Sequence, residues 1–397
     1  MNRVSCVSAT DSRVLKLLNS AIRPGIEEMS TQLHLLADGL EIRRKLSAIL
    51  AGAASSVCIV MYIFSADESG RAVLSELIHA AQSGVSVRVI VDGFGSASTP
   101  DRFFAPLRDA GGQVQWFNTR WHPRYLFRNH QKFVIADGRT VITGGFNIGV
   151  SYFGDGVESG WRETGIAVEG PSVKELQDYF EELWEALARG TVRLRDLTDW
   201  SGKARHPDKD VEWVISGPGL GRSLYGNYLR KDLIRASRLS VMMGYFVPSA
   251  SLRRTIGRIA RRGRVELVLP QTTDFPISRY AAWFTFGRLL RDGCEIHEYR
   301  PRPLHAKLIV ADDIVYAGSA NLDFRSLHLN FEMSVRVRDA VLAIDARQLI
   351  QKDIGLSRRI TQEIYDQNSG IFQRLIRSAA YTLLSRFDYF LSRKFLD

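Results

Sequence analysis

Uncharged hydrophobic runs alternate with amphipathic segments along most of the chain. Residues 46–64 include no charged side chain over nineteen positions. Such a run is long enough for a membrane span, but it also fits a helix end, a turn of small residues at 53–56 and a buried strand at 57–64. Residues 233–247 have the same layout, and there Arg235 and Arg238 interrupt the helix end. We therefore expect the helix–turn–strand arrangement in both places.

The same order of elements occurs twice. Each predicted strand is followed by a predicted helix, over 70–83 and 252–262, that ends at a glycine. The apolar runs that come next, within 85–95 and 265–270, predict strands buried on both faces. Strand, helix, strand, helix, strand in each copy predicts an α/β protein made of two similar halves. Two copies of one unit usually pack about a pseudo-twofold axis, which would give the halves one shared active site.

These patterns divide the chain into five predicted segments. An N-terminal extension covers residues 1–30, and the polar segment 199–210, which contains a proline, is the predicted linker. The first half covers 31–198 and the second covers 211–350. A basic, helical tail covers 351–397.

Each half carries the same short polar motif, "NHQKFVIAD" in the first and "LHAKLIVAD" in the second. A spacing of two residues places histidine and lysine on one face of a strand. The aspartate lies seven residues after the histidine, at a predicted hairpin turn, so we expect it to brace the turn. In order, the residues are His130, Lys132 and Asp137, then His305, Lys307 and Asp312.

A corner of small residues follows each motif, "GGFN" at 144–147 and "GSAN" at 318–321. Its glycines permit close backbone approach, and Asn147 and Asn321 can donate amide hydrogens to an anion. Two histidines, two lysines and two asparagines suit phosphodiester exchange. One imidazole attacks phosphorus, the other protonates the leaving alkoxide, and the lysines neutralise the phosphate oxygens. This chemistry requires no metal or other cofactor, and we predict none.

Charge and cysteine content limit the kind of partner and the compartment that we expect for this protein. The formal net charge of +10 and the pI near 9.6 favour an anionic partner, either nucleic acid or an acidic membrane surface. Charge alone does not choose between them. Three cysteines without CxxC spacing form neither a disulfide framework nor a zinc site, which suits a reducing compartment. The N-terminus lacks the apolar core of a secretory signal.

The paired motifs HxKxxxxD with GGxN or GSxN resemble those of the phospholipase D superfamily. Within it, "TGGFNIG", "WRETGIAVEGPSV" and "GSANLDFRSLHLNFE" resemble bacterial cardiolipin synthases, in particular the short type without N-terminal transmembrane helices. The resemblance implies two phospholipase D-like halves around one active site. It also implies that His130 forms a phosphohistidine and that His305 is the general acid and base. Reasoning from the residues alone leaves open which histidine attacks.

The resemblance also implies the remaining site residues. Glu163 and Glu332 would orient the histidines, and the two motif aspartates would belong to the catalytic set. The expected phosphate-binding residues are Lys132, Asn147, Lys307, Ser319 and Asn321.

The implied reaction condenses two phosphatidylglycerol molecules, or phosphatidylglycerol and another phospholipid, to cardiolipin with release of glycerol. A phospholipid hydrolase of the phospholipase D type, or a phosphodiester nuclease, would use the same site. We expect phospholipid substrates, an anionic membrane surface and no nucleic-acid partner. The implied location is peripheral, on the cytoplasmic side of the inner membrane. The sequence leaves the oligomeric state open.

Three segments offer possible routes to lipid. In the tail, residues 371–397, apolar residues recur at spacings of three and four, with five basic side chains against two acidic ones. This segment predicts either an amphipathic helix on an anionic membrane or a helix docked on the core. The arginine-rich run at 252–264 favours a solvated helix face. Aromatic residues within 279–290 could line a lipid entrance or fill the core.

Overall fold

The computed structural model describes most of the chain. The described residues are 31–117, 128–154, 160–189, 210–218 and 223–387. The predicted N-terminal extension and all but the last residue of the predicted linker lie outside them.

The first half is built on a seven-stranded sheet with the strand order β1-β7-β6-β5-β2-β3-β4. Parallel pairing of β2, β3 and β4 comes from helical crossovers, and the other pairs are antiparallel. The elements in chain order are β1 (Gln32–Leu36), α2 (Gly39–Gly52), β2 (Ser56–Met61), α3 (Glu68–Gln82), β3 (Ser86–Asp92), η1 (Asp101–Phe104), α4 (Ala105–Asp109), β4 (Gln113–Phe117), β5 (Phe133–Ala136), β6 (Thr140–Gly144), α5 (Val150–Phe153), β7 (Gly165–Glu169) and α6 (Val173–Ala188).

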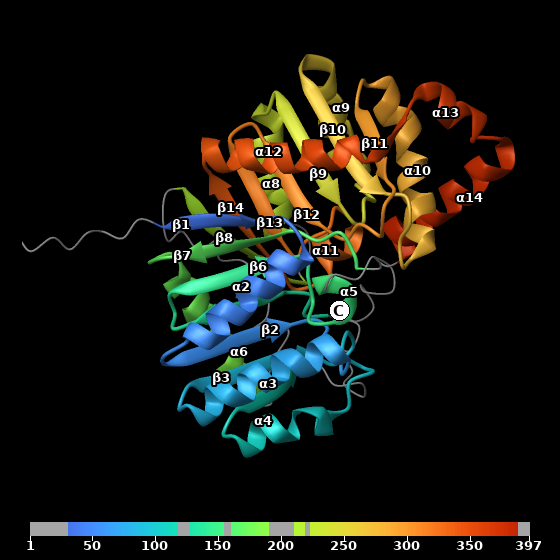
Figure 1. Cartoon of the computed structure of the whole chain (residues 1–397). Coiled ribbons are helices and arrows are strands. Elements are labelled where there is room, and N and C mark those ends of the chain that lie inside the picture. The colour runs from blue at the N-terminus through green and yellow to red at the C-terminus, as the bar shows by residue number, and fades with distance from the viewer. Residues whose placement is uncertain (1–30, 118–127, 155–159, 190–209, 219–222, 388–397) are drawn as a thin grey trace, which may run out of the picture. The chain divides into compact units, whose positions relative to one another are not determined.

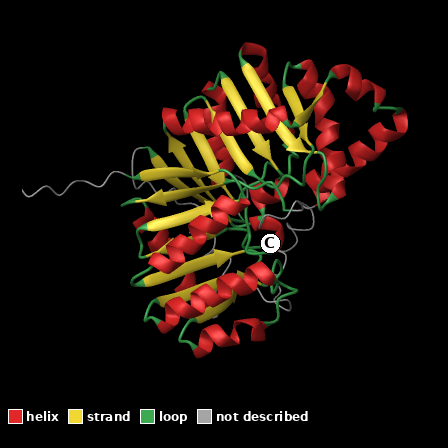
Figure 2. Cartoon of the chain, viewed as in Figure 1, coloured by secondary structure: helices red, strands yellow, loops and turns green. Residues whose placement is uncertain are grey.

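The second half repeats this topology in an eight-stranded sheet with the order β15-β11-β10-β9-β12-β13-β14-β8 (Figures 1 and 2). Leaving out β15, each strand occupies the place of its counterpart in the first sheet. The elements are β8 (Val211–Ser216), α8 (Leu224–Arg235), β9 (Arg238–Met243), α9 (Ala250–Arg262), β10 (Arg264–Pro270), α10 (Pro276–Arg291), β11 (Glu295–Tyr299), β12 (Lys307–Ala311), β13 (Ile314–Gly318), α11 (Phe324–His328), β14 (Glu332–Arg338), α12 (Ala340–Gly355), β15 (Ser357–Ile360), α13 (Gln362–Gln367), α14 (Ile371–Thr382) and η2 (Leu383–Phe387). The predicted α/β fold of two similar halves is confirmed.

The uncharged run 46–64 forms a helix end, a turn and a central strand, as predicted. Helix α2 begins at Asp38, whose side chain accepts a hydrogen bond from the Glu41 amide, and it ends before the small residues at 53–56. Strand β2 then lies between β3 and β5 with nearly every residue buried, which explains its lack of charge. Among the described residues, no helix is long and apolar enough to cross a membrane.

The two halves share one hydrophobic core. It contains side chains from both sheets and from α6 and α12, while each half has a second core under its own outer helices. A buried ion pair also joins the halves, because Arg162 Nε lies 2.8 Å from Asp353 Oδ2 of α12. We conclude that residues 31–387 form one folded unit whose halves cannot separate without exposing this shared core.

The predicted boundary of the second half needs correction. Position 350 falls inside α12, and β15 continues the second sheet by pairing with β11. The second half therefore extends beyond residue 350, because these segments cover and complete its sheet. Only the segment after β15 can be a tail, and there α14 docks against α10.

Candidate active site

Each histidine motif lies beside a segment from the opposite half. The His130 amide donates to Phe331 O over 2.9 Å, and the Phe331 amide donates to Arg128 O over the same distance. In the same way, the His305 amide donates to Arg162 O over 2.9 Å. Each motif therefore lies next to the residue that precedes a glutamate of the other half. The two contacts are equivalent under the pseudo-twofold symmetry of the halves.

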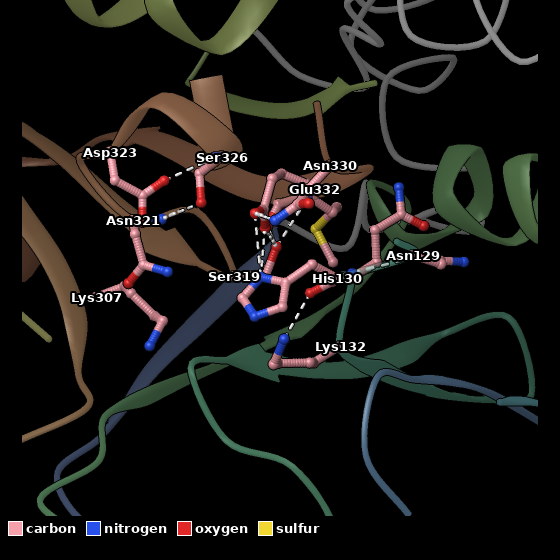
Figure 3. A network of polar contacts seen from close by, with 12 residues as sticks. Asn129, His130, Lys132, Lys307, Ser319, Asn321, Asp323, Ser326, Asn330 and Glu332 are labelled. Carbon is pink, nitrogen blue, oxygen red and sulfur yellow. Dashed lines mark hydrogen bonds and ion pairs between the residues drawn. The ribbon is translucent and has the colours of Figure 1, made fainter. Parts of the chain in front are cut away.

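The carboxylate nearest to His130 is consequently that of Glu332. His130 Nδ1 lies 3.0 Å from both of its oxygens (Figure 3). Ser319 Oγ also donates to this carboxylate over 2.5 Å, and Asn330 Nδ2 over 3.2 Å. Because Nδ1 faces the carboxylate, Nε2 is the ring nitrogen left for chemistry.

His305 has the equivalent arrangement with Glu163, at 2.6 Å between Nδ1 and Oε1. The second oxygen of this carboxylate, Oε2, is buried and has no hydrogen-bond partner among the described residues. Gly145 occupies the place that Ser319 has in the other half. A Cβ atom at Gly145 would lie 2.7 Å from Glu163 Oε2, so a serine has no room there. The two carboxylates thus differ in their support although the topology is the same.

Burial dominates the protonation of the site. Burial, followed by the positive charges of Lys132 and Lys307, lowers the pKa of His130 well below its ordinary value. Burial also lowers the pKa of His305, although Glu163 opposes this change. Burial therefore favours the neutral form of both imidazoles. In the same way, burial raises the pKa of Glu332 to about 7.

The two lysines lie behind the histidines. Lys132 Nζ donates to the His130 carbonyl over 2.6 Å, and Lys307 Nζ donates to the His305 carbonyl over 2.5 Å. Neither lysine is among the residues that line the cavity in front of the histidines. Burial lowers their pKa values to about 7 for Lys132 and about 8 for Lys307. Each ammonium group has further N–H donors besides the one that it gives to the carbonyl.

A cavity of about 460 Å³ opens in front of the two histidines. Its walls differ in charge. Arg128 and Arg325 line it together with Tyr62, whose ring is 4.8 Å from that of His130. Asp274 lines it with Tyr245, and the hydroxyl of Tyr245 donates to the Asp274 carboxylate. The ring of Tyr245 is 5.9 Å from that of His305. The wall at Tyr62 therefore carries two guanidinium groups and the wall at Tyr245 a carboxylate, and Asp323 lines the cavity as well.

Most of the predicted site residues come together here. The asparagines of the two corners, Asn147 and Asn321, line the cavity and are buried. Asn147 Oδ1 accepts from the Ile63 amide over 3.0 Å, so its amide group remains as a donor. The expectation for Ser319 needs correction, because its fully buried hydroxyl is directed at Glu332 rather than at the cavity. Its position supports the carboxylate instead of a phosphate.

The structure does not bring Asp137 and Asp312 to the histidines. Strand β5 separates Lys132 from Asp137 by roughly 16 Å of extended chain. The Asp137 carboxylate accepts hydrogen bonds from the amides of residues 54–56, at 2.7 to 2.9 Å. Asp312 does the same for the amides of 237 and 238. The prediction that these two aspartates brace turns is confirmed. Their inclusion in the catalytic set was wrong, because their carboxylates bind turn amides far from the histidines.

Sequence reasoning missed the aromatic and charged walls of the cavity. Tyr62 directly follows β2 and Tyr245 comes two residues after β9, so the repeat places Gly244, and not Tyr245, opposite Tyr62 and gave no signal for the pair. Arg128 lies two residues before His130, and Arg325 lies within the quoted segment "GSANLDFRSLHLNFE". Asp274 comes from the loop between β10 and α10, which has no distinguishing pattern.

Comparison with known proteins assigns the family. A family described as "Cardiolipin synthase, PLD-like domain" matches residues 46–184 and 231–354. "Major cardiolipin synthase ClsA" of Bacillus subtilis (strain 168) is 32% identical over 344 residues, which are 84% of this chain and 71% of the relative. "Cardiolipin synthase A" of Pseudomonas entomophila (strain L48) is 32% identical over 345 residues, again 84% and 71%.

A solved structure agrees with the fold. The phosphatidylserine synthase of Haemophilus influenzae Rd KW20 superposes with a TM-score of 0.68 at 16% sequence identity, covering 92% of this chain and 94% of that one. At this identity the likeness concerns the fold alone.

Two α/β halves with paired histidines and lysines between them define a phospholipase D-type enzyme, a phosphatidyltransferase. The chain belongs to the cardiolipin synthase family of phospholipase D-like proteins.

Proposed function

We propose that this protein joins two phospholipids by phosphatidyl transfer, taking phosphatidylglycerol as donor and acceptor and forming cardiolipin and glycerol. The observation that carries the proposal is the pair of carboxylate-bound histidines at one cavity, in a chain of the cardiolipin synthase family. A two-step transfer needs one nucleophile and one acid–base group at the same phosphorus.

In the first step, His130 Nε2 attacks the phosphorus of the donor. The bond from phosphorus to the headgroup glycerol oxygen breaks, and His305, after taking up a proton, gives that proton to the leaving oxygen. Glycerol departs and a phosphatidyl group remains on His130. Glu332 stabilises the imidazole through Nδ1, and the ammonium groups of Lys132 and Lys307 offset the charge on the phosphoryl oxygens.

In the second step, the glycerol hydroxyl of another phosphatidylglycerol gives its proton to His305 and attacks the same phosphorus. The phosphorus–nitrogen bond to His130 breaks, and cardiolipin leaves with the histidine restored. The proton taken up by His305 replaces the one that it gave to the leaving group, so the cycle consumes two phosphatidylglycerol molecules per cardiolipin and glycerol.

The two walls of the cavity support different parts of this substrate. Arg128 and Arg325 suit a phosphate, since guanidinium groups bind phosphate oxygens in pairs. Asp274 and Tyr245 suit the hydroxyl groups of glycerol, because a carboxylate accepts hydrogen bonds from a polyol. Transfer to a lipid alcohol, rather than hydrolysis, requires such a site for the acceptor.

We further propose that the enzyme works on the surface of an anionic membrane, on the cytoplasmic side of the inner membrane. The excess of basic residues and the two buried free cysteines, Cys58 and Cys294, suit that setting.

The direct test is incubation of the purified protein with phosphatidylglycerol vesicles, with the products measured by lipid mass spectrometry. We expect cardiolipin and free glycerol in equal amounts, and neither from a His130→Ala variant. Phosphatidic acid in place of cardiolipin would show a hydrolase. No lipid product, together with cleavage of a nucleic-acid phosphodiester, would show a nuclease and overturn the proposal.

A further inference from the structure

Helix α14 presents a row of large apolar side chains to solvent. Ile371, Phe372 and Leu375 are 82%, 72% and 64% exposed, and Ile376 is 40% exposed. These residues lie at spacings of one, three and four, which places them on one side of the helix. A contiguous exposed apolar surface of this kind marks an interaction site in a soluble fold.

The opposite side of α14 fixes how the helix is oriented. The Tyr381 ring stacks on Phe284 of α10 at 4.6 Å, and its hydroxyl donates to Pro248 O over 2.9 Å. Arg377 is buried, and its guanidinium lies 4.5 Å from the centre of the Trp283 ring. Figure 1 shows α14 beside α10 at the edge of the second half. Because this side is docked, the row at 371–376 cannot turn inward.

The same region adjoins the catalytic cavity. Leu384, in the turn that follows α14, lines the cavity and packs with Val247, which also lines it. Phe275, at the start of α10, lines the cavity and is 49% exposed. Apolar side chains therefore form the rim of the cavity on the side where α14 lies.

The charge around this surface is positive. From residue 371 to residue 387 the chain contains no aspartate or glutamate. Arg374 lies exposed on α14, next to Leu375 of the apolar row. An apolar face beside an exposed arginine complements a bilayer with anionic headgroups, where the apolar residues enter the acyl boundary and the arginine meets phosphates.

We propose that the outer face of α14 inserts into an anionic lipid bilayer and holds the rim at Phe275 and Leu384 against the lipid surface. Phospholipid then enters the cavity along an apolar path without passing through water. This inference rests on the proposed function for the identity of the lipid substrate, but the surface itself can be tested separately.

The test compares Phe372→Asp/Leu375→Asp with Val341→Asp/Ile344→Asp. The control pair lies on α12, is 69% and 54% exposed, and adds the same charge to the same number of apolar side chains. Full-length proteins are floated with vesicles of equal parts phosphatidylglycerol and phosphatidylcholine, and with phosphatidylcholine alone. We expect wild type and control to float with the anionic vesicles, and the α14 variant to float at least tenfold less. Wild type should bind phosphatidylcholine vesicles more weakly.

A second measurement separates the surface from the chemistry. On monomeric dihexanoyl-phosphatidylglycerol, which needs no bilayer, the α14 variant should turn over as wild type does. Equal flotation of the α14 variant and wild type would overturn the inference, as would an equal loss in the control. The inference would also be overturned if wild type were a dimer, the α14 variant were a monomer, and both bound vesicles equally. If wild type floats through α14 but converts no phosphatidylglycerol, the surface is supported and the proposed function fails.

Discussion

The imidazole of His130 and the carboxylate of Glu332 meet across 202 positions of the chain, with Nδ1 3.0 Å from both carboxylate oxygens. In the reciprocal pair, His305 Nδ1 lies 2.6 Å from Glu163 Oε1, and the two residues are 142 positions apart in the chain. Each half therefore supplies the carboxylate that contacts the histidine of the other half. Neither half alone holds a histidine with its carboxylate.

The first prediction concerns this exchange of carboxylates. Glu332→Gln should lower kcat by roughly 100-fold, because the amide cannot stabilise a charged imidazole through Nδ1. The thermal midpoint should change little, since glutamine has the same shape. Glu169→Gln is the control, because Glu169 pairs with Arg139 at the surface. Steady-state kinetics decide, and a Glu332→Gln enzyme with wild-type kcat would contradict the role.

Ser319 gives a prediction about pH. Burial raises the pKa of Glu332 to about 7, and the Ser319 hydroxyl opposes this rise. Ser319→Ala should therefore raise that pKa further, so the carboxylate ionises only at higher pH. The acidic limb of the kcat–pH profile should move to higher pH. Ser216→Ala, which removes a buried hydroxyl with no hydrogen-bond partner in the described part of the chain, should leave the limb in place. A shift to lower pH would contradict this argument.

Asp137 should matter for stability and not for chemistry. Its φ of 54° suits glycine, so Asp137→Gly removes the acceptor without straining the turn. We expect a loss of about 1–2 kcal/mol in the free energy of unfolding, similar to loss of a helix cap, with kcat of the folded enzyme unchanged. Denaturant unfolding and kinetics measure the two effects. A large loss of kcat in a fully folded variant would return Asp137 to the catalytic set.

The Asp137 contribution also has a defined pH range. Burial raises the pKa of this carboxyl, but the hydrogen bonds from residues 54–56 outweigh burial and lower it to about 2. A lowered folded-state pKa stabilises the fold above the unfolded value of about 4, and this stabilisation is lost as pH falls toward 2. The difference in stability between wild type and Asp137→Gly should therefore shrink over that range.

Asp274 should control which acceptor reacts. Asp274→Asn removes the charge that faces the hydroxyl groups of the acceptor, so the phosphatidyl group on His130 should react more often with water. The ratio of cardiolipin to phosphatidic acid should fall about tenfold. Glu295→Gln, at a surface ion pair with Arg264, is the control. An unchanged product ratio would show that Asp274 does not bind the acceptor.

Much of the fold could be predicted from the sequence because the chain repeats itself. The segment equivalent to the uncharged run 46–64 contains Arg235 and Arg238, which indicated that neither segment spans a membrane. The paired HxK motifs indicated one shared site. The boundary at 350 was not predictable, since α12 and β15 belong to the second half through contacts with distant strands.

Residue type and spacing were enough to predict that His130 and His305 lie at one cavity. The site was not predictable where the partner is set by three-dimensional packing. The family resemblance implied that Ser319 binds phosphate, but its hydroxyl is directed at a glutamate of the next strand. Asp274 reaches the cavity from a loop whose course the local sequence does not determine.

The most direct test of the proposed transfer is to trap the intermediate. In His305→Ala, a phosphatidyl p-nitrophenyl ester can react, because its leaving group needs no proton, while release of the phosphatidyl group lacks a base. Transfer through His130 predicts a burst of one equivalent of nitrophenolate and a phosphatidyl group on the peptide that contains His130, with no burst when His130 is also replaced by alanine. An adduct on another residue, or a burst that survives the loss of His130, would contradict it.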